Sequence, residues 1–314
     1  MEIISGIDNF RYSFDTCVTI GTFDGLHKGH QEVLKKLKKI ALEKKLKSLA
    51  VTFSPHPRQV LCPNAKVFFV LSKQEKIEAF EKIGIDYLVI QPFSLEFAKL
   101  SAEDFFKNML CKHLNMKYLV KGFNNHFGKD RVSEFSEIQK IGFNCGFEVT
   151  ETKKMVLKSS LEVSSTALRK YISEGQFENV SEILGRGFPL SGKVVHGKQI
   201  GKTIGFPTAN IILDDENKII PKIGVYASFT IINGRKYPVM LNVGSNPTIN
   251  GENEKQVFLE AHILDFSDNL YSKKIRLTIV KRIRDEKKFS SLEELKRQLN
   301  LDKSLVAEII QTSL

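Results

Sequence analysis

Cysteine is scarce in this chain, and long apolar segments are missing from it. The cysteines Cys17, Cys62, Cys111 and Cys145 form no C-x-x-C pair. This spacing excludes a disulfide framework and a zinc ribbon, so we expect reduced thiols and a cytoplasmic location. No apolar run approaches the roughly 18 residues of a membrane-spanning helix, the longest compact run being residues 67–71. The N-terminus carries acidic residues and no apolar core, which argues against a secretory signal.

The overall composition is that of a globular protein. Of the 314 residues, 42% are hydrophobic and 26% are charged, which excludes a wholly disordered chain. At about 150 residues per domain, this length predicts two domains. The net charge is +11, and lysines crowd residues 35–45, where apolar residues recur at helical spacing. We interpret this segment as an amphipathic helix with a solvated basic face, and we do not expect nucleic acid as a partner. A positive potential also suits anionic small molecules.

The first part of the chain alternates short apolar runs with helical patterns. The expected strands cover residues 17–20, 49–53, 87–90, 118–120 and 147–149. The expected helices cover residues 31–46, a segment opening with a Ser72–Glu75 capping box, and residues 102–112 capped by Ser101. This alternation predicts parallel β-α-β units and a doubly wound, Rossmann-like sheet. Ligands of such sheets bind beyond the carboxyl ends of the strands.

After a helical stretch at residues 166–184 the period of the pattern changes. The expected strands now cover residues 192–196, 224–232, 236–243, 256–263 and 274–283. Turn signals such as Asn233-Gly234 and Asn250-Gly251 separate them. A last helix is expected to open at Ser290, with Glu293 as its capping-box partner. Successive strands and one terminal helix predict an antiparallel β-barrel, with a domain boundary near residues 185–189.

The first candidate site is the loop from Gly21 to His30, between an expected strand and an expected helix. Glycines allow a tight turn and a close approach to a ligand, and the helix start offers unpaired N–H groups. His27 and His30 are three residues apart, so both can face the same phosphates. A loop with two surface histidines is the plainer alternative, and a metal site would need a third ligand. The pattern favours anion binding.

Three motifs together resemble the bacterial bifunctional riboflavin kinase/FAD synthetase family. Residues 21–30 (GTFDGLHKGH) resemble the H-x-G-H signature of nucleotidylyltransferases in the form that this family has. Residues 52–57 (TFSPHP) resemble its second motif, and residues 164–169 (SSTALR) its S-S-T-x-x-R motif. The order and spacing of the three agree with the family, which makes the resemblance more specific than H-x-G-H alone.

The resemblance implies that residues 1–184 form an FMN adenylyltransferase domain, which transfers AMP from ATP to FMN with Mg²⁺ and releases pyrophosphate. Because the attacking phosphate is already ionised, positioning and charge neutralisation are enough, and no base is required. The resemblance assigns catalysis to His27 and His30, and ATP binding to Gly21, Phe23, Asp24, Gly25, His27, His30, Ser165, Thr166 and Arg169. It assigns flavin binding to His56, Pro57 and Asn124. From the residues alone, Ser165 and Thr166 also fit a helix N-cap.

One segment of this part departs from the family. The usual G-x-D-F-x-F-G reads GFNNHFG at residues 122–128, with Asn124 in place of the acid. Asparagine keeps an acceptor and loses the charge. If only one activity were retained, the adenylyl transfer is the one that we expect to be weak.

The second part of the chain carries a different motif. Residues 197–203 (GKQIGKT) look like a P-loop, but three residues separate the glycines where the motif has four, and Pro207 follows closely. We therefore expect no true P-loop. Residues 205–210 (GFPTAN) resemble the P-T-A-N signature of riboflavin kinase. Further matches lie at residues 224–227, 242–244, Pro247-Thr248, the Glu260 strand and residues 284–289.

The resemblance implies that residues 185–314 form a riboflavin kinase domain, built on a six-stranded barrel, that phosphorylates the ribityl 5′-hydroxyl. It assigns ATP binding to Gly197, Gly201, Lys202, Thr208 and Asn210, the metal to Thr208 and Asn210, and flavin binding to Glu260 and Arg284. A neutral alcohol benefits from a base, and that role falls to Glu260. From the residues alone, Glu260 could equally lie on the solvated face of a half-buried strand. The family's Tyr-Gly is here Tyr271-Ser272.

The main hypothesis is thus a bifunctional enzyme whose partners are the small molecules riboflavin, FMN, FAD and ATP. Two alternatives stay open. The chain could retain only one activity, or it could be a flavin-binding or RNA-binding protein that uses the basic helix. The sequence leaves the oligomeric state open.

Overall fold

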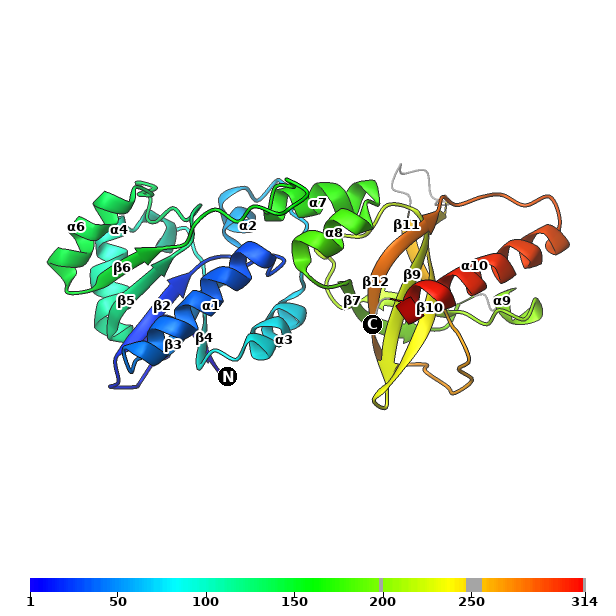
Figure 1. The fold of residues 1–314 in the computed structure, drawn as a ribbon, viewed down its shortest axis with the longest axis horizontal. Coiled ribbons are helices and arrows are strands. Elements are labelled where there is room, and N and C mark those ends of the chain that lie inside the picture. Colours follow the sequence, from blue (N-terminus) through cyan, green and yellow to red (C-terminus); the bar gives the residue numbers. More distant parts are fainter. Residues whose placement is uncertain (198–199, 247–255, 313–314) are drawn as a thin grey trace. The chain divides into compact units, whose positions relative to one another are not determined.

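Two compact units make up the chain, and the structure, a computed structural model, describes residues 1–197, 200–246 and 256–312. The first unit comprises Met1–Val67 and Lys76–Ser164. The second comprises Phe68–Glu75 and Ser165–Leu314. Figure 1 shows a sheet with helices in the first and a barrel in the second. Among the described residues, none of the helices is long and apolar enough to cross a membrane.

The first unit holds a six-stranded sheet in the order β1-β4-β3-β2-β5-β6, and all five neighbouring pairs are parallel. This confirms the predicted doubly wound sheet. The strands are β1 (Glu2–Ser5), β2 (Thr16–Ile20), β3 (Lys47–Phe53), β4 (Tyr87–Gln91), β5 (Met116–Lys121) and β6 (Glu148–Glu151). The helices are α1 (Lys28–Glu43), α2 (Pro57–Leu61), α3 (Lys73–Ile83), α4 (Ala102–Asp104), α5 (Lys112–Leu114) and α6 (Phe135–Cys145), with the short turns η1 (Ile7–Asn9) and η2 (Phe97–Lys99) and the π-helical η3 (Phe105–Cys111).

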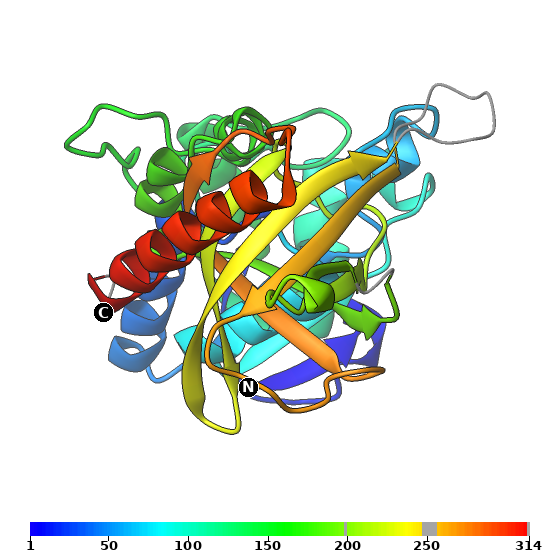
Figure 2. The ribbon, with the colours of Figure 1, turned by 90° about the vertical axis from the view of Figure 1, so that its right-hand side faces the viewer.

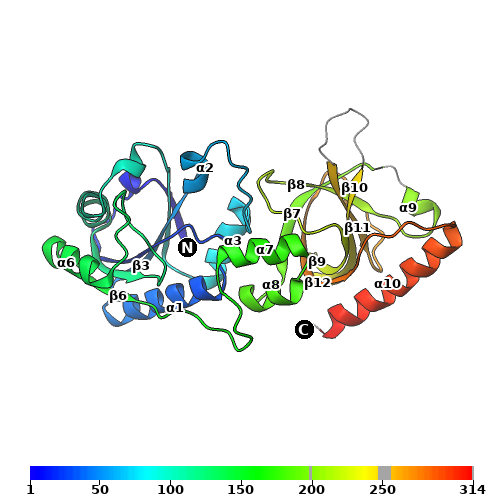
Figure 3. The same cartoon turned by 90° about the horizontal axis from the view of Figure 1, so that it is seen from above.

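Both faces of this sheet are covered, as a parallel sheet requires. α1 lies along one face and contacts β2, β3 and β5 (Figure 3). The predicted apolar positions, Val33, Leu34, Leu37, Ile40 and Ala41, are buried, and most lysines of the helix are exposed. The basic face also bonds the protein itself, since Lys36 donates to the Glu151 carbonyl at 2.8 Å and Lys38 to the Ile83 carbonyl at 2.7 Å. On the other face, Phe106 and Leu110 of η3 share a core with β2 and β3.

Two predicted helices differ in detail from the structure. The helix expected at residues 102–112 begins as predicted, with Ser101 Oγ accepting from Asp104 N at 3.1 Å, but it winds as a π-helix over Phe105–Cys111. Side-chain spacing alone does not distinguish these two windings. The stretch at residues 166–184 is two helices, α7 (Ser165–Glu174) and α8 (Phe177–Leu184). Gly175 separates them with a φ of 76°, a conformation that suits glycine.

The second unit is a closed antiparallel barrel in the order β10-β11-β8-β7-β12-β9, which confirms the predicted six-stranded barrel. Its strands are β7 (Phe188–Val195), β8 (Ala209–Leu213), β9 (Gly224–Ile232), β10 (Arg235–Asn246), β11 (Gln256–Ile263) and β12 (Lys274–Arg284). Its further helices are α9 (Ile200–Thr203) and α10 (Leu292–Thr312). The sequence pattern missed β8, β1 and α6, because each is short or lacks clear periodicity.

α10 lies against the barrel wall and contacts β9, β10 and β12 (Figure 2). Val306 and Ile310 are buried there with Phe206 and Val225. The predicted capping box of this helix, Ser290 with Glu293, is wrong by one residue. Ser291 Oγ accepts from Glu294 N at 3.1 Å, and the Glu294 carboxylate accepts from Ser290 N. The sequence has two adjacent serines, Ser290 and Ser291, and two adjacent glutamates, Glu293 and Glu294. A capping box could form with either pair, and the packing of the helix decides between them.

Candidate functional site

The Gly21–His30 loop joins the carboxyl end of β2 to the start of α1, where a parallel sheet binds its ligands. His27 caps α1, since its Nδ1 accepts from His30 N at 3.3 Å. In a neutral His27 the proton therefore lies on Nε2. The two histidine rings stack with centroids 3.6 Å apart. The structure thus brings together the two histidines that the motif predicted.

The electrostatics of this loop come from burial. Burial first, then His27 and then Lys76, hold the pKa of His30 well below its ordinary 6.5, so His30 is neutral at physiological pH. Its buried Nδ1 has no hydrogen-bond partner in the described part of the chain. Asp24 is also buried. A neutral ring with an unsatisfied nitrogen beside a helix start is suited to a polar ligand atom.

Neighbouring elements fix the shape of the loop. Phe23 and Leu26 have φ values of 49° and 41°, which is a strained conformation for such side chains. The Thr22 carbonyl accepts from Lys76 Nζ at 2.9 Å and from Thr52 Oγ1 at 3.2 Å. The Phe80 ring packs edge-on against Phe23, with centroids 5.2 Å apart. Lys76 is a residue that the sequence analysis missed, because no motif includes it.

The predicted flavin residues of this unit lie on two separate loops. His56 caps α2, where its Nδ1 accepts from Arg58 N at 3.1 Å, and Pro57 is the first helical residue. Asn124 is exposed, in the turn that follows β5. Its neighbour Asn125 is the one that attaches this turn to the site, because its Nδ2 donates to the Ile20 carbonyl at the end of β2.

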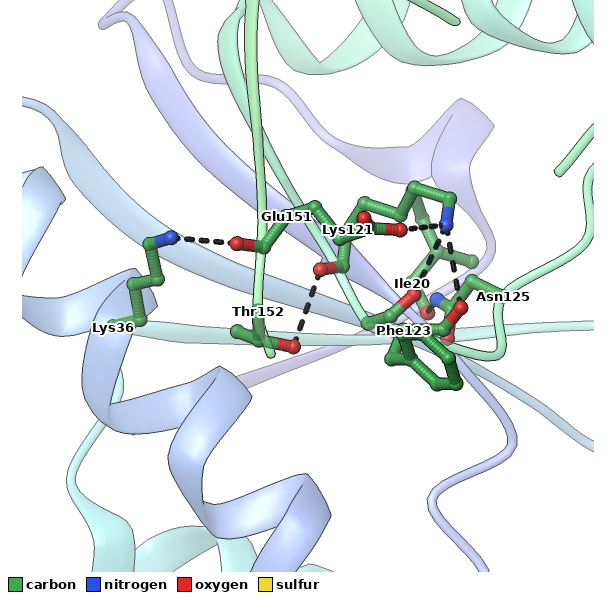
Figure 4. Close-up of polar contacts among 8 residues, drawn as sticks. Ile20, Lys36, Lys121, Phe123, Asn125, Glu151 and Thr152 are labelled. Carbon is green, nitrogen blue, oxygen red and sulfur yellow. Dashed lines mark hydrogen bonds and ion pairs between the residues drawn. The ribbon is translucent and has the colours of Figure 1, made fainter. Parts of the chain in front are cut away.

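A buried lysine anchors the same turn (Figure 4). Lys121, the last residue of β5, is 1% exposed and pairs with the Glu151 carboxylate. Its Nζ also reaches the carbonyls of Gly122 and Phe123 at 3.4 Å each. Thr152 Oγ1 donates to the Lys121 carbonyl at 3.4 Å, which ties the next segment to β5. These contacts fix the turn that presents Asn124.

The third motif lies in the other unit. Ser165 is the first residue of α7, and Thr166 and Arg169 follow in its first two turns. Arg169 Nε donates to the Phe68 carbonyl at 3.0 Å, within the second unit. A helix does begin at this motif, but Ser165 is already its first helical residue, so the N-cap role that the plainer interpretation gave to Ser165 and Thr166 is wrong. A role for these three residues at the ATP site stays a prediction.

The barrel encloses a cavity of about 530 Å³ that gathers predicted kinase residues from distant parts of the chain. Six of the predicted residues line it: Gly197, Gly201, Thr208, Asn210, Glu260 and Arg284. At Gly197 an added Cβ would overlap Asn210, so glycine is needed there for close packing. Lys202 belongs to α9, and its side chain lies outside the described residues, as do Pro247 and Thr248. α9 is a single short turn, which agrees with the expectation that no true P-loop is present.

The cavity wall holds a row of polar side chains across three adjacent strands. On β11, Glu260 lies opposite Asn210 of β8 and opposite Asn242 of β10. Directly opposed residues of antiparallel strands have Cβ atoms about 5 Å apart. Leu259 and Ala261 on either side of Glu260 are buried on the other face of the strand. The face that could have been a solvated surface therefore lines a cavity, and Asn242 joins the predicted residues.

A second missed residue holds Arg284. Asp302 of α10 is 2% exposed and accepts from Arg284 Nε at 3.0 Å and from Arg284 Nη2 at 2.7 Å. Gln298 Nε2 donates to the same carboxylate at 2.9 Å. Such a bidentate pair fixes the plane of a guanidinium group. No sequence pattern indicates this pair, because Asp302 lies 18 residues beyond Arg284 on an ordinary amphipathic helix.

His262 is a third missed residue, two positions after Glu260 on the same face of β11. It lines the cavity, and its Nδ1 lies 2.8 Å from the Pro207 carbonyl. Burial lowers its pKa, so the ring is neutral and the Nδ1–H donates to that carbonyl. The bond attaches the P-T-A-N segment to β11, at a point just before β8 begins.

The donor set of the cavity fits Mg²⁺. Thr208 offers a hydroxyl oxygen, Asn210 an amide oxygen and Glu260 a carboxylate. Magnesium prefers oxygen ligands, and it often uses one or two carboxylates together with substrate phosphates and water. In the described part of the chain, no three His, Cys, Asp or Glu side chains form a metal cluster.

Ser272 is a departure from the family that affects the backbone. Its φ is 62°, in the left-handed region that favours glycine. Ser272 N donates to the Val194 carbonyl at 2.9 Å, so the turn keeps its place beside β7. The serine is accommodated at a cost of about 1 kcal/mol.

Known proteins resemble both parts of the chain. The model of the FAD synthetase family matches residues 11–167, and that of the riboflavin kinase family matches residues 184–310. The bifunctional riboflavin kinase/FMN adenylyltransferase of Escherichia coli K12 is 35% identical over 98% of this chain and 97% of its own length. The Pseudomonas fluorescens protein of the same description is 36% identical over 96% of each chain.

A solved structure has the same fold over nearly the whole length. It is a Streptococcus pneumoniae crystal structure described as a macrolide-efflux protein. It is 32% identical, covers 98% of this chain and 99% of its own, and has a TM-score of 0.89. The two family matches and the full-length relatives together show that this chain belongs to the bifunctional riboflavin kinase/FMN adenylyltransferase family.

Proposed function

We propose that this chain phosphorylates riboflavin to FMN in its barrel and adenylylates FMN to FAD at the Gly21–His30 loop, with ATP as co-substrate of both reactions. Family membership supports the two reactions. The observation that carries the assignment of sites is the Asn210–Glu260–Asn242 row inside the barrel cavity. We assign the kinase to residues 185–314 and the adenylyltransferase to residues 1–184, with α7 contributing to the latter.

In the kinase reaction Glu260 accepts the proton of the ribityl 5′-hydroxyl as that oxygen attacks the γ-phosphorus of ATP. The bond from the γ-phosphorus to the β,γ-bridging oxygen breaks, and ADP leaves. A neutral alcohol is a poor nucleophile, so a positioned base is worth about 10²–10⁴-fold. Asn210 and Asn242 flank the carboxylate and orient the reacting groups, and Arg284 donates to the flavin. Mg²⁺, held by Thr208 and Asn210 with the phosphates of ATP, would neutralise charge on those phosphates.

In the adenylyl reaction a phosphate oxygen of FMN attacks the α-phosphorus of ATP, and pyrophosphate leaves with the electrons of the broken P–O bond. No proton has to be removed from the nucleophile. His27 donates from Nε2, and the N–H groups at the start of α1 add the positive end of the helix dipole. His30 completes the anion site, Thr166 and Arg169 bind the triphosphate, and His56, Pro57 and Asn124 contact the flavin.

Two parallel incubations test the proposal. Purified chain is given riboflavin and Mg-ATP, and then FMN and Mg-ATP, and the flavins are separated by chromatography. We expect FMN and then FAD from the first mixture and FAD from the second. Omitting Mg²⁺ should stop both reactions. Flavin binding without consumption of ATP would mean that the chain is a binding protein, and FMN without FAD would mean that only the kinase is active.

A further inference from the structure

Buried lysines in this chain are paired with carboxylates in two clear cases. Lys121 is 1% exposed and pairs with Glu151 (Figure 4). Lys218 is 1% exposed and pairs with Glu75 at 2.5 Å, in the second unit. A buried charge needs such a partner, because leaving water costs several kcal/mol. Each ammonium group is therefore already neutralised within its own unit and has a structural explanation.

Lys76 of α3 is half-buried and differs from both in its partners. Its Nζ makes one hydrogen bond, to the Thr22 carbonyl at 2.9 Å, and the ion pairs among the described residues do not include it. Burial lowers its pKa, and the nearby Asp24 carboxylate opposes that shift. An ammonium group has three donors, so two of its N–H groups are left for another acceptor. This shielded and incompletely bonded cation stands at the loop that carries the H-x-G-H motif.

Within the loop, the one lysine is Lys28, a half-buried residue at the start of α1. His30 is neutral, and the Nδ1 of His27 is occupied by the helix cap. Asp24 adds a buried carboxylate. A nucleoside triphosphate brings several negative charges, which the neutral His30 ring and the Asp24 carboxylate do not neutralise. Lys76 is close enough to lower the pKa of His30, so it faces the same space as the histidine pair.

The position of Lys76 is fixed from two sides. Phe80, four residues later and on the same face of α3, packs on Phe23. Together Lys76 and Phe80 hold consecutive residues of the loop. A cation that is fixed before the substrate arrives stabilises developing charge without having to reorganise.

We propose that Lys76 is the fixed cation of the adenylyl site and binds the ATP phosphates while it holds the Thr22 carbonyl. The proposal rests on the FMN adenylylation proposed above. As the FMN oxygen bonds to the α-phosphorus and the bond to the leaving pyrophosphate breaks, charge accumulates on the pyrophosphate. The Lys76 ammonium neutralises that charge and transfers no proton.

Three substitutions at one position separate charge from loop support. Lys76→Met removes both, Lys76→Gln keeps a donor for Thr22 without the charge, and Lys76→Arg keeps the charge. We expect kcat/KM for ATP in FAD formation to fall about 10²-fold in Lys76→Met and in Lys76→Gln, and less than about tenfold in Lys76→Arg. The KM for FMN should stay within about twofold. Lys82→Met, at an exposed position of the same helix, is the matched control and should behave as wild type.

Riboflavin phosphorylation by the same preparations reports whether each variant is folded. If Lys76→Met also loses that activity, the Gln and Arg variants decide the question. Normal FAD formation by Lys76→Gln would reduce Lys76 to a support for Thr22 and overturn the proposal. A rise in the KM for FMN with an unchanged KM for ATP would overturn the assignment to ATP. A wild-type chain that makes no FAD would instead refute the proposed function itself.

Discussion

The two candidate sites differ in architecture, and the phosphate-transfer reactions that we propose for them differ in the nucleophile. The adenylyl site of the first unit is built mostly from one stretch of ten residues, at the junction of β2 and α1. The kinase site of the second unit gathers residues from β8, β10, β11 and the end of β12. The adenylyl site handles a nucleophile that is already an anion, and it offers hydrogen-bond donors and the N-terminus of a helix. The second handles a neutral alcohol and offers a carboxylate between two amides.

The comparison teaches that nucleophile chemistry selects the kind of site. An anionic nucleophile needs its charge neutralised, which backbone N–H groups and a few cations can do locally. A hydroxyl needs a base whose surroundings orient it, and that requires side chains from several strands. Variants that affect one reaction and spare the other therefore test this comparison directly.

The largest expected effect is at Glu260. Glu260→Gln keeps the size and the hydrogen bonding of the side chain and removes the carboxylate. We expect riboflavin phosphorylation to slow by about 10²–10⁴-fold, because the base is lost. FAD formation from supplied FMN should be nearly unchanged. Turnover with each flavin on one preparation measures both, and Glu293→Gln on α10 is the control.

Two outcomes would break the comparison at this point. Loss of both activities in a folded Glu260→Gln protein would indicate that the two reactions share a site or are coupled. Loss of neither would return Glu260 to an ordinary strand residue.

The next effect concerns the histidine pair. His30→Ala should reduce FAD formation from FMN by about 10²–10³-fold, since it removes one group that binds the phosphates. The kinase activity should stay near wild type, because the substituted loop belongs to the other unit. Initial rates with FMN and with riboflavin measure the contrast. His113→Ala, in α5 of the same unit, should leave both rates unchanged, and full FAD synthesis by His30→Ala would refute the assignment.

A smaller effect should follow from the Asp302–Arg284 pair. Asp302→Asn keeps the shape of the side chain but weakens the bidentate bond, so Arg284 loses its fixed plane. We expect the KM for riboflavin to rise about tenfold, with an unchanged KM for ATP. The free energy of unfolding should fall by about 2 kcal/mol, less than for a fully buried pair, because Arg284 is partly exposed.

The control for this variant is Glu178→Gln, which alters an exposed pair with Lys281, a residue on the same strand as Arg284. It should change neither quantity much, because exposed pairs contribute little. An Asp302→Asn protein with a normal KM for riboflavin and reduced stability would show that the pair only supports the fold.

The smallest effect is at Ser272 and concerns stability alone. Ser272→Gly relieves a left-handed backbone conformation, and part of the gain is offset by the greater freedom of glycine in the unfolded chain. We expect a gain of roughly 0.5–1 kcal/mol in the free energy of unfolding, measured by denaturant titration. Ser304→Gly, in the middle of α10, should instead be destabilising. An equal loss in the free energy of unfolding for Ser272→Gly and Ser304→Gly would contradict the argument from backbone strain.

Local patterns determined much of this protein in advance. The strand and helix periods predicted a parallel sheet followed by an antiparallel barrel, because each period reports which side chains face a core. The loop from Gly21 to His30 was recognisable because all its groups lie within ten residues. Glu260 alternated with Leu259 and Ala261, so its face of the strand was predictable, although what that face lined was not.

Tertiary packing decided the rest. The contacts of Lys76 with Thr22, of Asp302 with Arg284 and of His262 with Pro207 join residues 18 to 55 positions apart, and no local period records them. The sequence by itself determined most of the elements and the motif residues that we propose for the chemistry, since both depend on neighbours along the chain. Only the folded structure decided which buried lysines pair with carboxylates and which face of β11 lines a cavity. It also decided which side chains position the proposed reactive groups, because all of these contacts depend on neighbours in space.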